Sequence, residues 1–285
     1  MVNNSQRIGS AGTLLVSEAV RKSFSPEIAE GHYLAKLAQT PAEVESALRL
    51  RYEVFNLELA APNDDSTGIG LEYDKYDALC KHLIVVNVLN GKTVGTYRLN
   101  SIESAKNAQG FYACNEFSLE DLPIEILSRS IEVGRACVAR EHRNPKVLFL
   151  LWKVLLHHLK CSGKRYFFGC CSLFTQDCEI GAKVYQQFER NGYIHLEIRI
   201  QPRWEREFPV NETYPAAEQI ELPALFNMYL KIGVKICGEP AIDREFGTID
   251  YFVLFDLQAM SEKYQKMFFG VKSAAVEAIR ALAYR

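Results

Sequence analysis

The chain lacks several features that would assign it to a protein class at once. Its eight cysteines contain no CxxC pair, which fits a reduced cytoplasmic protein better than a disulfide scaffold or a zinc site. No apolar run approaches the roughly 20 residues that span a bilayer, and no secretory apolar segment opens the chain. We therefore expect a cytoplasmic protein with no bound metal.

An excess of charge of either sign is also lacking. The formal net charge is −2, so the chain as a whole gives no argument for a nucleic-acid partner. An anionic partner would have to meet a local basic patch. With 48% hydrophobic residues, the 285 residues can bury a sizeable core.

The order of apolar patterns predicts an α/β domain without internal repeats. Thr40-Pro41-Ala42-Glu43 has the cap, the early proline and the glutamate of a helix start. Asn90-Gly91 between two alternating runs predicts a hairpin, and the later alternation of strands and helices predicts a mixed sheet. The expected strands are 82–88, 92–99, 131–138, 165–173, 193–200 and 248–257, with 111–119 as a strand or an irregular edge, and the expected helices begin near 40, 146, 178 and 224.

We divide the chain into a loose polar arm over 1–30, one α/β domain over 31–257 and a helical extension over 258–285. The extension has helical periodicity, because its apolar residues fall on one face after Met267, Phe268 and Phe269. This face either packs on the sheet, which we favour, or makes a peripheral contact with the inner membrane. Its residues are Val271, Ala274, Ala275, Ile279 and Leu282.

Residues 130–152 carry the most informative pattern. Their strand holds Glu132 and Arg135, which would face opposite ways unless a bulge at Gly134 brings them to one face. The strand leads to a basic turn and a helix start, where free N–H groups attract anions. The basic residues there are Arg140, His142, Arg143 and Lys146. A strand, an anion-binding loop and a helix are what an acyltransferase that uses phosphopantetheine needs.

Other charged residues lie within or beside apolar elements. Arg51 and Arg98 need partners, because a buried charge is rarely left unpaired. We predict that Arg51 and Arg98 form one network with Glu132 and Arg135. The alternative is a simple ion pair between Glu132 and Arg135. Asp74 and Asp77 either solvate a loop or order a lid that attracts the ammonium group of an acceptor.

Five short motifs follow one another over about residues 48–256. They are Arg51-Tyr52-Glu53-Val54-Phe55; Asp74-Lys75-Tyr76-Asp77 with Cys80 and His82; Gly95-Thr96-Tyr97-Arg98-Leu99; Glu132-Val133-Gly134-Arg135; and Tyr229 to Gly233 followed by Asp243 to Thr248 and Asp250. This series resembles the GNAT acyltransferase superfamily, in the branch of acyl-homoserine-lactone synthases and long-chain N-acyl amino acid synthases. The fifth motif resembles the ornithine-lipid-forming members rather than the lactone synthases.

The resemblance implies a GNAT-like α/β fold, in which helices flank a mixed, mostly antiparallel central sheet with splayed strands. It implies that acyl carrier protein, with acyl-CoA as the alternative, donates a long-chain acyl group to the amine of an amino acid. The phosphopantetheine arm would enter between the splayed strands, the acyl chain would fill an apolar tunnel, and no cofactor would stay bound. The implied residues are Glu132, Arg135, Arg98 and Arg51 for catalysis; Asp74, Asp77, Phe55, Tyr97, Cys137 and Val138 for substrate; and Arg140, His142, Arg143 and Lys146 for the carrier and its arm.

Two departures from the family pattern bear on the chemistry. The loop 141–146 has no glycine, which argues against tight binding of a whole CoA through its pyrophosphate. Phe188 stands where many relatives have a tyrosine acid, and Tyr185 lies one turn earlier. Sulfur is a good leaving group, so a strong acid is not obligatory. Glu132 is the best candidate base, and a backbone N–H between Arg135 and Val138 is the candidate oxyanion donor. The alternative functions are a lactone-like signal synthase and a non-catalytic protein that binds acyl chains or carrier protein.

Overall fold

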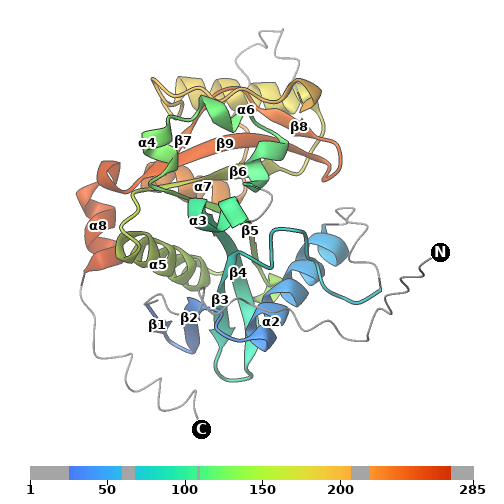
Figure 1. The fold of residues 1–285 in the computed structure, drawn as a ribbon, viewed down its shortest axis with the longest axis vertical. Helices are drawn as coiled ribbons and strands as arrows, with labels where there is room; N and C mark the ends of the chain where they lie inside the picture. Colours follow the sequence, from blue (N-terminus) through green and yellow to red (C-terminus); the bar gives the residue numbers. More distant parts are fainter. Residues whose placement is uncertain (1–25, 60–67, 108–109, 207–218, 271–285) are drawn as a thin grey trace, which may run out of the picture.

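A computed structural model describes residues 26–59, 68–107, 110–206 and 219–270 (Figure 1). Most of the expected arm, up to residue 25, and the apolar face expected over 271–285 lie outside the described residues. The last part of the expected arm, Ile28–Glu30, forms a strand that pairs with Tyr33–Leu37.

One sheet of nine strands organises the described part of the chain, in the order β1-β2-β3-β4-β5-β6-β9-β7, with β8 beside β9. Neighbouring strands are antiparallel except β5 and β6, which are parallel. The strands are β1 (Ile28–Glu30), β2 (Tyr33–Leu37), β3 (Lys81–Asn87), β4 (Lys92–Ser101), β5 (Ser130–Val138), β6 (Tyr166–Leu173), β7 (Lys235–Ile236), β8 (Ala241–Asp243) and β9 (Thr248–Asp256). The predicted mixed, mostly antiparallel sheet is confirmed.

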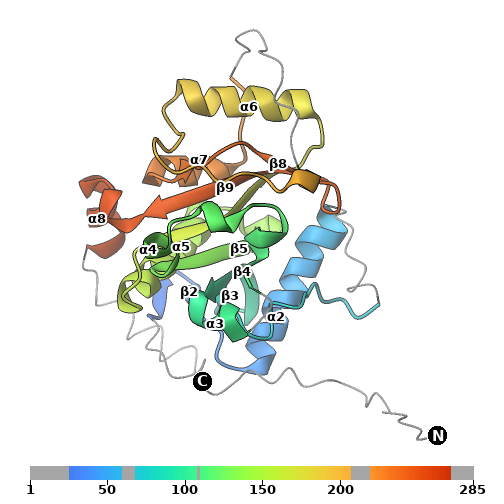
Figure 2. The same ribbon diagram turned by 45° about the horizontal axis from the view of Figure 1, so that its top comes forward.

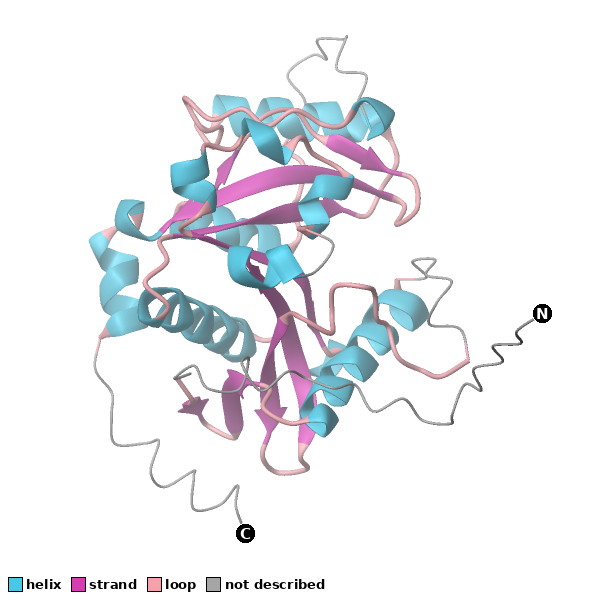
Figure 3. Cartoon of the chain, viewed as in Figure 1, coloured by secondary structure: helices cyan, strands magenta, loops and turns pink. Residues whose placement is uncertain are grey.

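Helices cover both faces of this sheet, as Figures 1, 2 and 3 show. The buried face of α5 packs on β1–β4, while α2 packs on β3, β4 and β5 from the other side. The helices are α2 (Pro41–Arg51), α3 (Ile102–Asn107), α4 (Ile124–Leu127), α5 (Pro145–Cys161), α6 (Cys178–Arg190), α7 (Ala224–Ile232) and α8 (Glu262–Phe269). A π-helical segment, η1 (Tyr52–Glu58), continues α2, and short 3₁₀ turns include η3 (Tyr112–Asn115), η4 (Leu119–Asp121), η5 (Arg140–His142), η6 (Trp204–Arg206) and η7 (Leu257–Ala259).

Local sequence signals account for several element boundaries. Thr40 and Glu43 form the predicted capping box at the start of α2. Asn90-Gly91 joins β3 to β4, and Gly91 has the positive φ of 71° that this turn requires. The predicted starts of α6 and α7 are also confirmed.

Burial on both sides explains why β6 is apolar throughout. Phe167 packs in the larger core cluster with Trp152 of α5, and the rings of these two residues are 6.3 Å apart. Phe168 points the other way and stacks on Phe252 at 5.7 Å in a second cluster. The alternation of strand side chains thus places each successive aromatic in a different core.

The strand alternative at 111–119 and the strand at 193–200 are wrong. The first, 111–119, is the 3₁₀ turn η3 followed by η4, and a single bridge joins Phe117 to Pro202. The second, 193–200, makes only one bridge, from Ile194 to Ile236. The chain then turns, and the ring of His195 accepts the N–H groups of Glu197 and Ile198. In this second segment a side chain takes the N–H groups that a neighbouring strand would otherwise take.

The central irregularity of the sheet lies where β5 leaves β6. Their parallel register covers Ser130 to Glu132 of β5 and ends there. Beyond it, Arg135 and Ala136 together oppose the single residue Tyr97 of β4, which is a β-bulge. Arg135 has a φ of 50°. The bulge predicted at Gly134 therefore exists one residue later.

Gly169 of β6 sits at this point of divergence, and it tests how tightly the strands are held. An added Cβ would lie 2.3 Å from the carbonyl oxygen of Val133 in β5. Gly169→Ala should therefore destabilise the fold by roughly 1–3 kcal/mol, the usual effect of overpacking. Gly134→Ala is the matched control, because a Cβ there meets no atom within 4 Å. Urea unfolding of both variants decides the matter, and equal stability would contradict this geometry.

Candidate active site

Three arginines converge on the bulge from three different elements. Arg51 is the last residue of α2, Arg98 lies in β4 and Arg135 lies in β5. The side chains of Arg51 and Arg98 are 1% and 4% exposed, so their charges need partners inside the protein. The partners come from the loop before β3 and are Glu72, Asp74 and Asp77.

The hydrogen bonds of this network are mostly charge-assisted pairs. Arg51 donates to both carboxylate oxygens of Asp77, at 2.6 and 3.0 Å, and its Nε donates to Glu72. Arg98 donates to Asp74 at 2.6 Å and to Asp77 at 3.2 Å. Such two-pronged contacts fix orientation as well as charge. The network therefore ties α2 and β4 to one loop.

Arg135 completes the network from the bulge. Its guanidinium donates to Glu72 and to Asp74, both at 3.2 Å. The rings of Tyr112 and Phe246 lie 4.6 and 4.7 Å from its guanidinium carbon. Cation–π contacts with aromatic rings add to the ion pairs. Carboxylates and aromatic rings together thus hold the side chain of Arg135, the bulge residue with the positive φ.

Burial and charge act in opposite directions on the carboxylates. Burial alone would raise the pKa of Asp77, but Arg51 and Arg98 hold that pKa well below its usual range. His82 donates from Nε2 to the backbone carbonyl of Asp77 at 3.2 Å, and burial lowers its pKa to about 4. His82 is then neutral at pH 7 and adds no further positive charge.

The composition of this network differs from our prediction. The three arginines are members, but Glu132 is not, and within the described ranges no ion pair joins Glu132 to Arg135. Glu72 was missed. A charge count offered a signal for it, because three buried arginines need about three carboxylates and the acidic loop supplies them together.

Glu132 instead binds backbone N–H groups. Its carboxylate accepts the N–H of Ala113 at 2.7 Å and of Tyr112 at 3.1 Å, and it lies 3.4 Å from the side-chain amide of Asn100. Burial raises the pKa of Glu132, although the two backbone N–H groups and Arg98 act against that shift. A carboxylate with a raised pKa is a stronger base than an exposed one.

A cleft of about 210 Å³ lies where β5 leaves β6. Glu132 and Arg135 both line it, so the bulge does bring these two residues to one cavity. Arg98 and Phe55 also reach this cleft. Many of its other lining residues are apolar or small, among them Val133, Gly169, Leu225, Phe226 and Tyr229. The arrangement offers a base beside an apolar cavity.

Three residues that we expected to contact substrate lie elsewhere. Tyr97 is buried in the core, where its hydroxyl is 2.5 Å from that of Tyr229. Cys137 packs beside Leu50 on the α2 side, and burial raises the pKa of its thiol. The carbonyl of Val138 accepts the Nε of Arg143 at 3.1 Å. None of Tyr97, Cys137 and Val138 lines either described cleft.

The basic turn lies outside both described clefts. Arg143 is paired with Glu58 at 2.6 Å, and His142 lies 2.9 Å from the hydroxyl of Tyr33. At the start of α5 the side chain of Asn144 accepts the N–H groups at positions 146 and 147. Two of the free donors expected at this helix start are thus already capped.

The described part of the C-terminal extension packs on the domain. Phe268 of α8 is fully buried and stacks on Phe149 of α5 at 5.1 Å. Its carbonyl lies 3.2 Å from the ring nitrogen of His157. In the described ranges no helix is long and apolar enough to cross a bilayer.

Comparisons with known proteins give the context of this site. The family model for an acetyltransferase (GNAT) domain matches residues 50–153. The chain is 30% identical over 251 residues to the L-ornithine N(alpha)-acyltransferase of Rhodobacter capsulatus, with 83% of this chain and 94% of that one covered. The L-ornithine N(alpha)-acyltransferase of Brucella abortus is 27% identical over 252 residues, with 82% and 88% covered. The crystal structure of the AHL synthase LasI matches with a TM-score of 0.47 and 12% identity, over 86% of this chain and 100% of that one.

Removal of one charge from the network should destabilise the protein strongly. Asp77→Asn removes the carboxylate that Arg51 and Arg98 share and leaves each guanidinium one carboxylate partner, Glu72 or Asp74. Three buried positive charges then face two negative ones, which should cost about 3–5 kcal/mol at pH 7. Glu45→Gln is the control, because the exposed Glu45–Arg49 pair should contribute only about 0.3–0.5 kcal/mol.

The effect should also depend on pH. The folded pKa of Asp77 is depressed, so its contribution is complete above the unfolded value of about 3.9 and shrinks as the pH falls below that value. Urea unfolding at several pH values measures the difference in free energy of unfolding between wild type and Asp77→Asn. A difference that stays constant down to about pH 2.5 would contradict the ionised state of Asp77.

Proposed function

The chain belongs to the family of L-ornithine N(alpha)-acyltransferases, and from that membership we propose that it transfers a long-chain fatty acyl group from acyl carrier protein to the α-amino group of ornithine or a related amino acid. Its activity class is that of an acyltransferase with a GNAT domain. The product would be an N-acyl amino acid of the kind that precedes an aminolipid. A lactone-like signal is the weaker candidate, because the named sequence relatives are ornithine acyltransferases.

The position of Glu132 carries this proposal. A buried carboxyl group with a raised pKa faces the cleft at the divergence of β5 and β6. Two backbone N–H groups fix its orientation, so it does not depend on a mobile side-chain partner. Amine acylation needs a base of this kind, because an amino acid carries its α-amine as an ammonium ion at pH 7.

The reaction would follow the order of direct aminolysis. Glu132 takes one proton from the ammonium, directly or through a water, and the amine nitrogen attacks the thioester carbonyl. A carbon–nitrogen bond forms, and the oxyanion accepts a hydrogen bond from a backbone N–H at the bulge, near Arg135 and Ala136. The carbon–sulfur bond then breaks. The pantetheine sulfur leaves as a thiolate and takes the second proton of the nitrogen, while Glu132 returns its proton to water.

Acyl carrier protein is supported as the donor by the basic turn and by the capped helix start. Carrier proteins are acidic, and Arg140 and Lys146 are exposed there. The N–H groups at positions 146 and 147 already donate to Asn144, which leaves fewer donors for a pyrophosphate. Contact of residues 271–285 with the inner membrane stays a prediction, since these residues lie outside the described ranges.

Chain-length dependence and Glu132→Gln together test the proposed function. Wild type should use acyl carrier protein thioesters of about ten or more carbons better than acetyl-CoA, because each buried CH₂ contributes about 0.8 kcal/mol. Glu132→Gln should lower the single-turnover rate about 10²–10⁴-fold. Glu125→Gln, on the exposed surface of α4, is the control.

Melting temperatures of the two variants separate chemistry from folding. A rate near that of wild type in Glu132→Gln would remove this residue from the mechanism. Equal or better use of acetyl-CoA by wild type would remove the long-chain donor from the proposal.

Charge reversal on the basic turn tests the carrier protein as partner. Arg140→Glu with Lys146→Glu should raise the KM for acyl carrier protein and weaken its salt dependence, since salt screens steering between opposite charges. Activity with a short acyl-pantetheine thioester should change little. Lys263→Glu with Lys266→Glu, on α8, is the matched control. A similar loss with both donors would show that the turn acts on the shared arm or on folding instead.

A further inference from the structure

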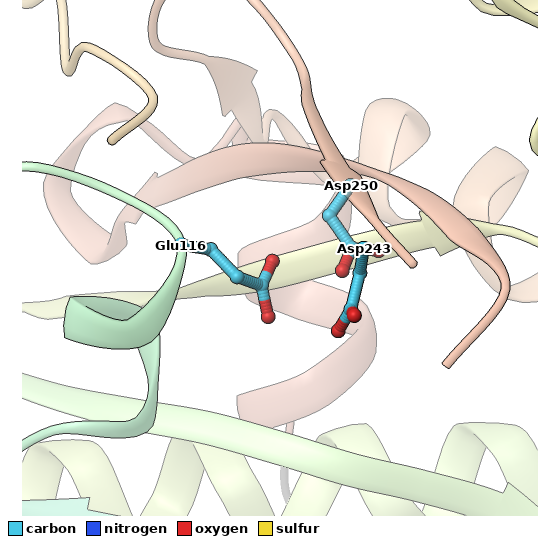
Figure 4. A group of neighbouring side chains, drawn as sticks. All are labelled: Glu116, Asp243 and Asp250. Carbon is cyan, nitrogen blue, oxygen red and sulfur yellow. The ribbon is translucent and has the colours of Figure 1, made fainter. Parts of the chain in front are cut away.

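Three carboxylates outside the ion-pair network gather at one point (Figure 4). Glu116 follows η3, Asp243 ends β8 and Asp250 lies in β9. One oxygen from each of them lies within 4.8 Å of the others, and the side chains point toward one another. Their exposures are 0%, 2% and 3%. Three acids at this depth need positive charge nearby.

The protein itself supplies only part of that charge. Arg206 donates to Asp243 at 2.6 Å, which pairs one of the three acids. Both carboxylate oxygens of Glu116 and Oδ1 of Asp250 have no hydrogen-bond partner among the described residues. Two ionised carboxylates cannot donate to each other, so a proton or a bound cation has to lie between them. Burial and the neighbouring acids accordingly raise the pKa of Glu116, and burial raises that of Asp250.

The three acids lie in the wall between two clefts. Asp250 lines the reaction cleft together with Glu132. Glu116 and Asp243 line a second, polar cleft of about 660 Å³. Both clefts share the side chains of Arg135, Tyr112 and Phe246. A small molecule in the second cleft could therefore reach both the acids and the region of Glu132.

The second cleft also contains positive charge. Arg203 and Arg206 line it beside Arg135. Arg206 and Arg135 are engaged in ion pairs, whereas Arg203 has no ion pair within the described part of the chain. A cleft with a guanidinium and two acids that have no ion pair among the described residues suits a molecule with a carboxylate and an ammonium group.

An organic ammonium fits the acids better than a divalent metal ion. Oδ1 of Asp243 already accepts Arg206 and the N–H groups of Glu245 at 2.9 Å and Phe246 at 3.1 Å. A guanidinium at this oxygen would repel a nearby divalent cation about twice as strongly as an ammonium at the same distance. An ammonium carries one charge and three donors, which match the three unpartnered oxygens of Glu116 and Asp250.

We infer that Glu116, Asp243 and Asp250 bind the side-chain ammonium of a diamino acid acceptor. This inference rests on the proposed function. It explains selection of the α-amine, because the side-chain nitrogen stays protonated between the acids while the α-nitrogen faces Glu132. Arg203 would then pair with the acceptor carboxylate. The three acids would distinguish ornithine from a neutral amino acid of the same length.

Norvaline tests this inference, since it is ornithine without the side-chain amine. Wild type should have a kcat/KM for ornithine about 10²–10⁴-fold above that for norvaline, as expected when a buried charge loses its partner. Glu116→Gln and Asp250→Asn should each lower kcat/KM for ornithine at least about 10-fold, mostly through KM, and leave norvaline unchanged or improved. Glu205→Gln, an exposed acid of the same cleft, is the matched control and should change neither value appreciably.

The remaining outcomes separate this inference from the proposed function. Equal use of ornithine and norvaline by wild type, or an equal loss with both in folded Glu116→Gln and Asp250→Asn, would overturn the ammonium site and leave the acyltransferase intact. Loss of ornithine use after EDTA treatment, restored by Mg²⁺ or Mn²⁺, would show a metal site instead. If wild type acylated no amino acid with any long-chain thioester, the proposed function would fail, and the inference with it. Melting temperatures confirm that each variant is folded.

Discussion

The buried network of Arg51, Arg98 and Arg135 with their three carboxylates is the constraint on which the site depends. Three positive and three negative charges lie together in the interior, so removal of any one leaves an uncompensated buried charge. The network joins α2, β4, β5 and the loop before β3, elements that are far apart in the sequence. It also holds the side chain of the bulge residue. The bulge in turn opens the cleft in which Glu132 and the apolar wall meet.

Much of the fold could be predicted from local sequence. The capping box at Thr40, the Asn90-Gly91 turn and the starts of α6 and α7 depend on residues within one element. The errors at 111–119 and 193–200 have another origin. Both segments have strand-like composition, but the N–H groups of the first bind Glu132, which lies some twenty residues away. Periodicity within a window contains no information about such a partner.

The residues of the site divide in the same way: some could be predicted from local sequence, and others depend on partners that are distant in the sequence. The motif residues Glu132 and Arg135 do share one cleft, and the need of buried arginines for partners was correctly expected. The identity of those partners was not predicted correctly, because it depends on which loop folds over the bulge. Tyr97 alternates with the cleft residues Arg98 and Asn100 along β4 and faces the core. Cys137 follows the cleft residues of β5 and packs beside Leu50 instead. Glu116 gave no signal, since its neighbours Asp243 and Asp250 come from the other end of the chain.

The central claim is that acyl transfer takes place where β5 leaves β6. The most direct test is a crystal structure of the protein with a long-chain acyl-phosphopantetheine amide, which cannot transfer its acyl group. We expect the pantetheine arm to lie between β5 and β6, with its carbonyl beside Arg135 and Ala136 and the acyl chain against Phe226 and Tyr229. An arm bound outside this gap, with Glu132 far from the carbonyl, would contradict the account.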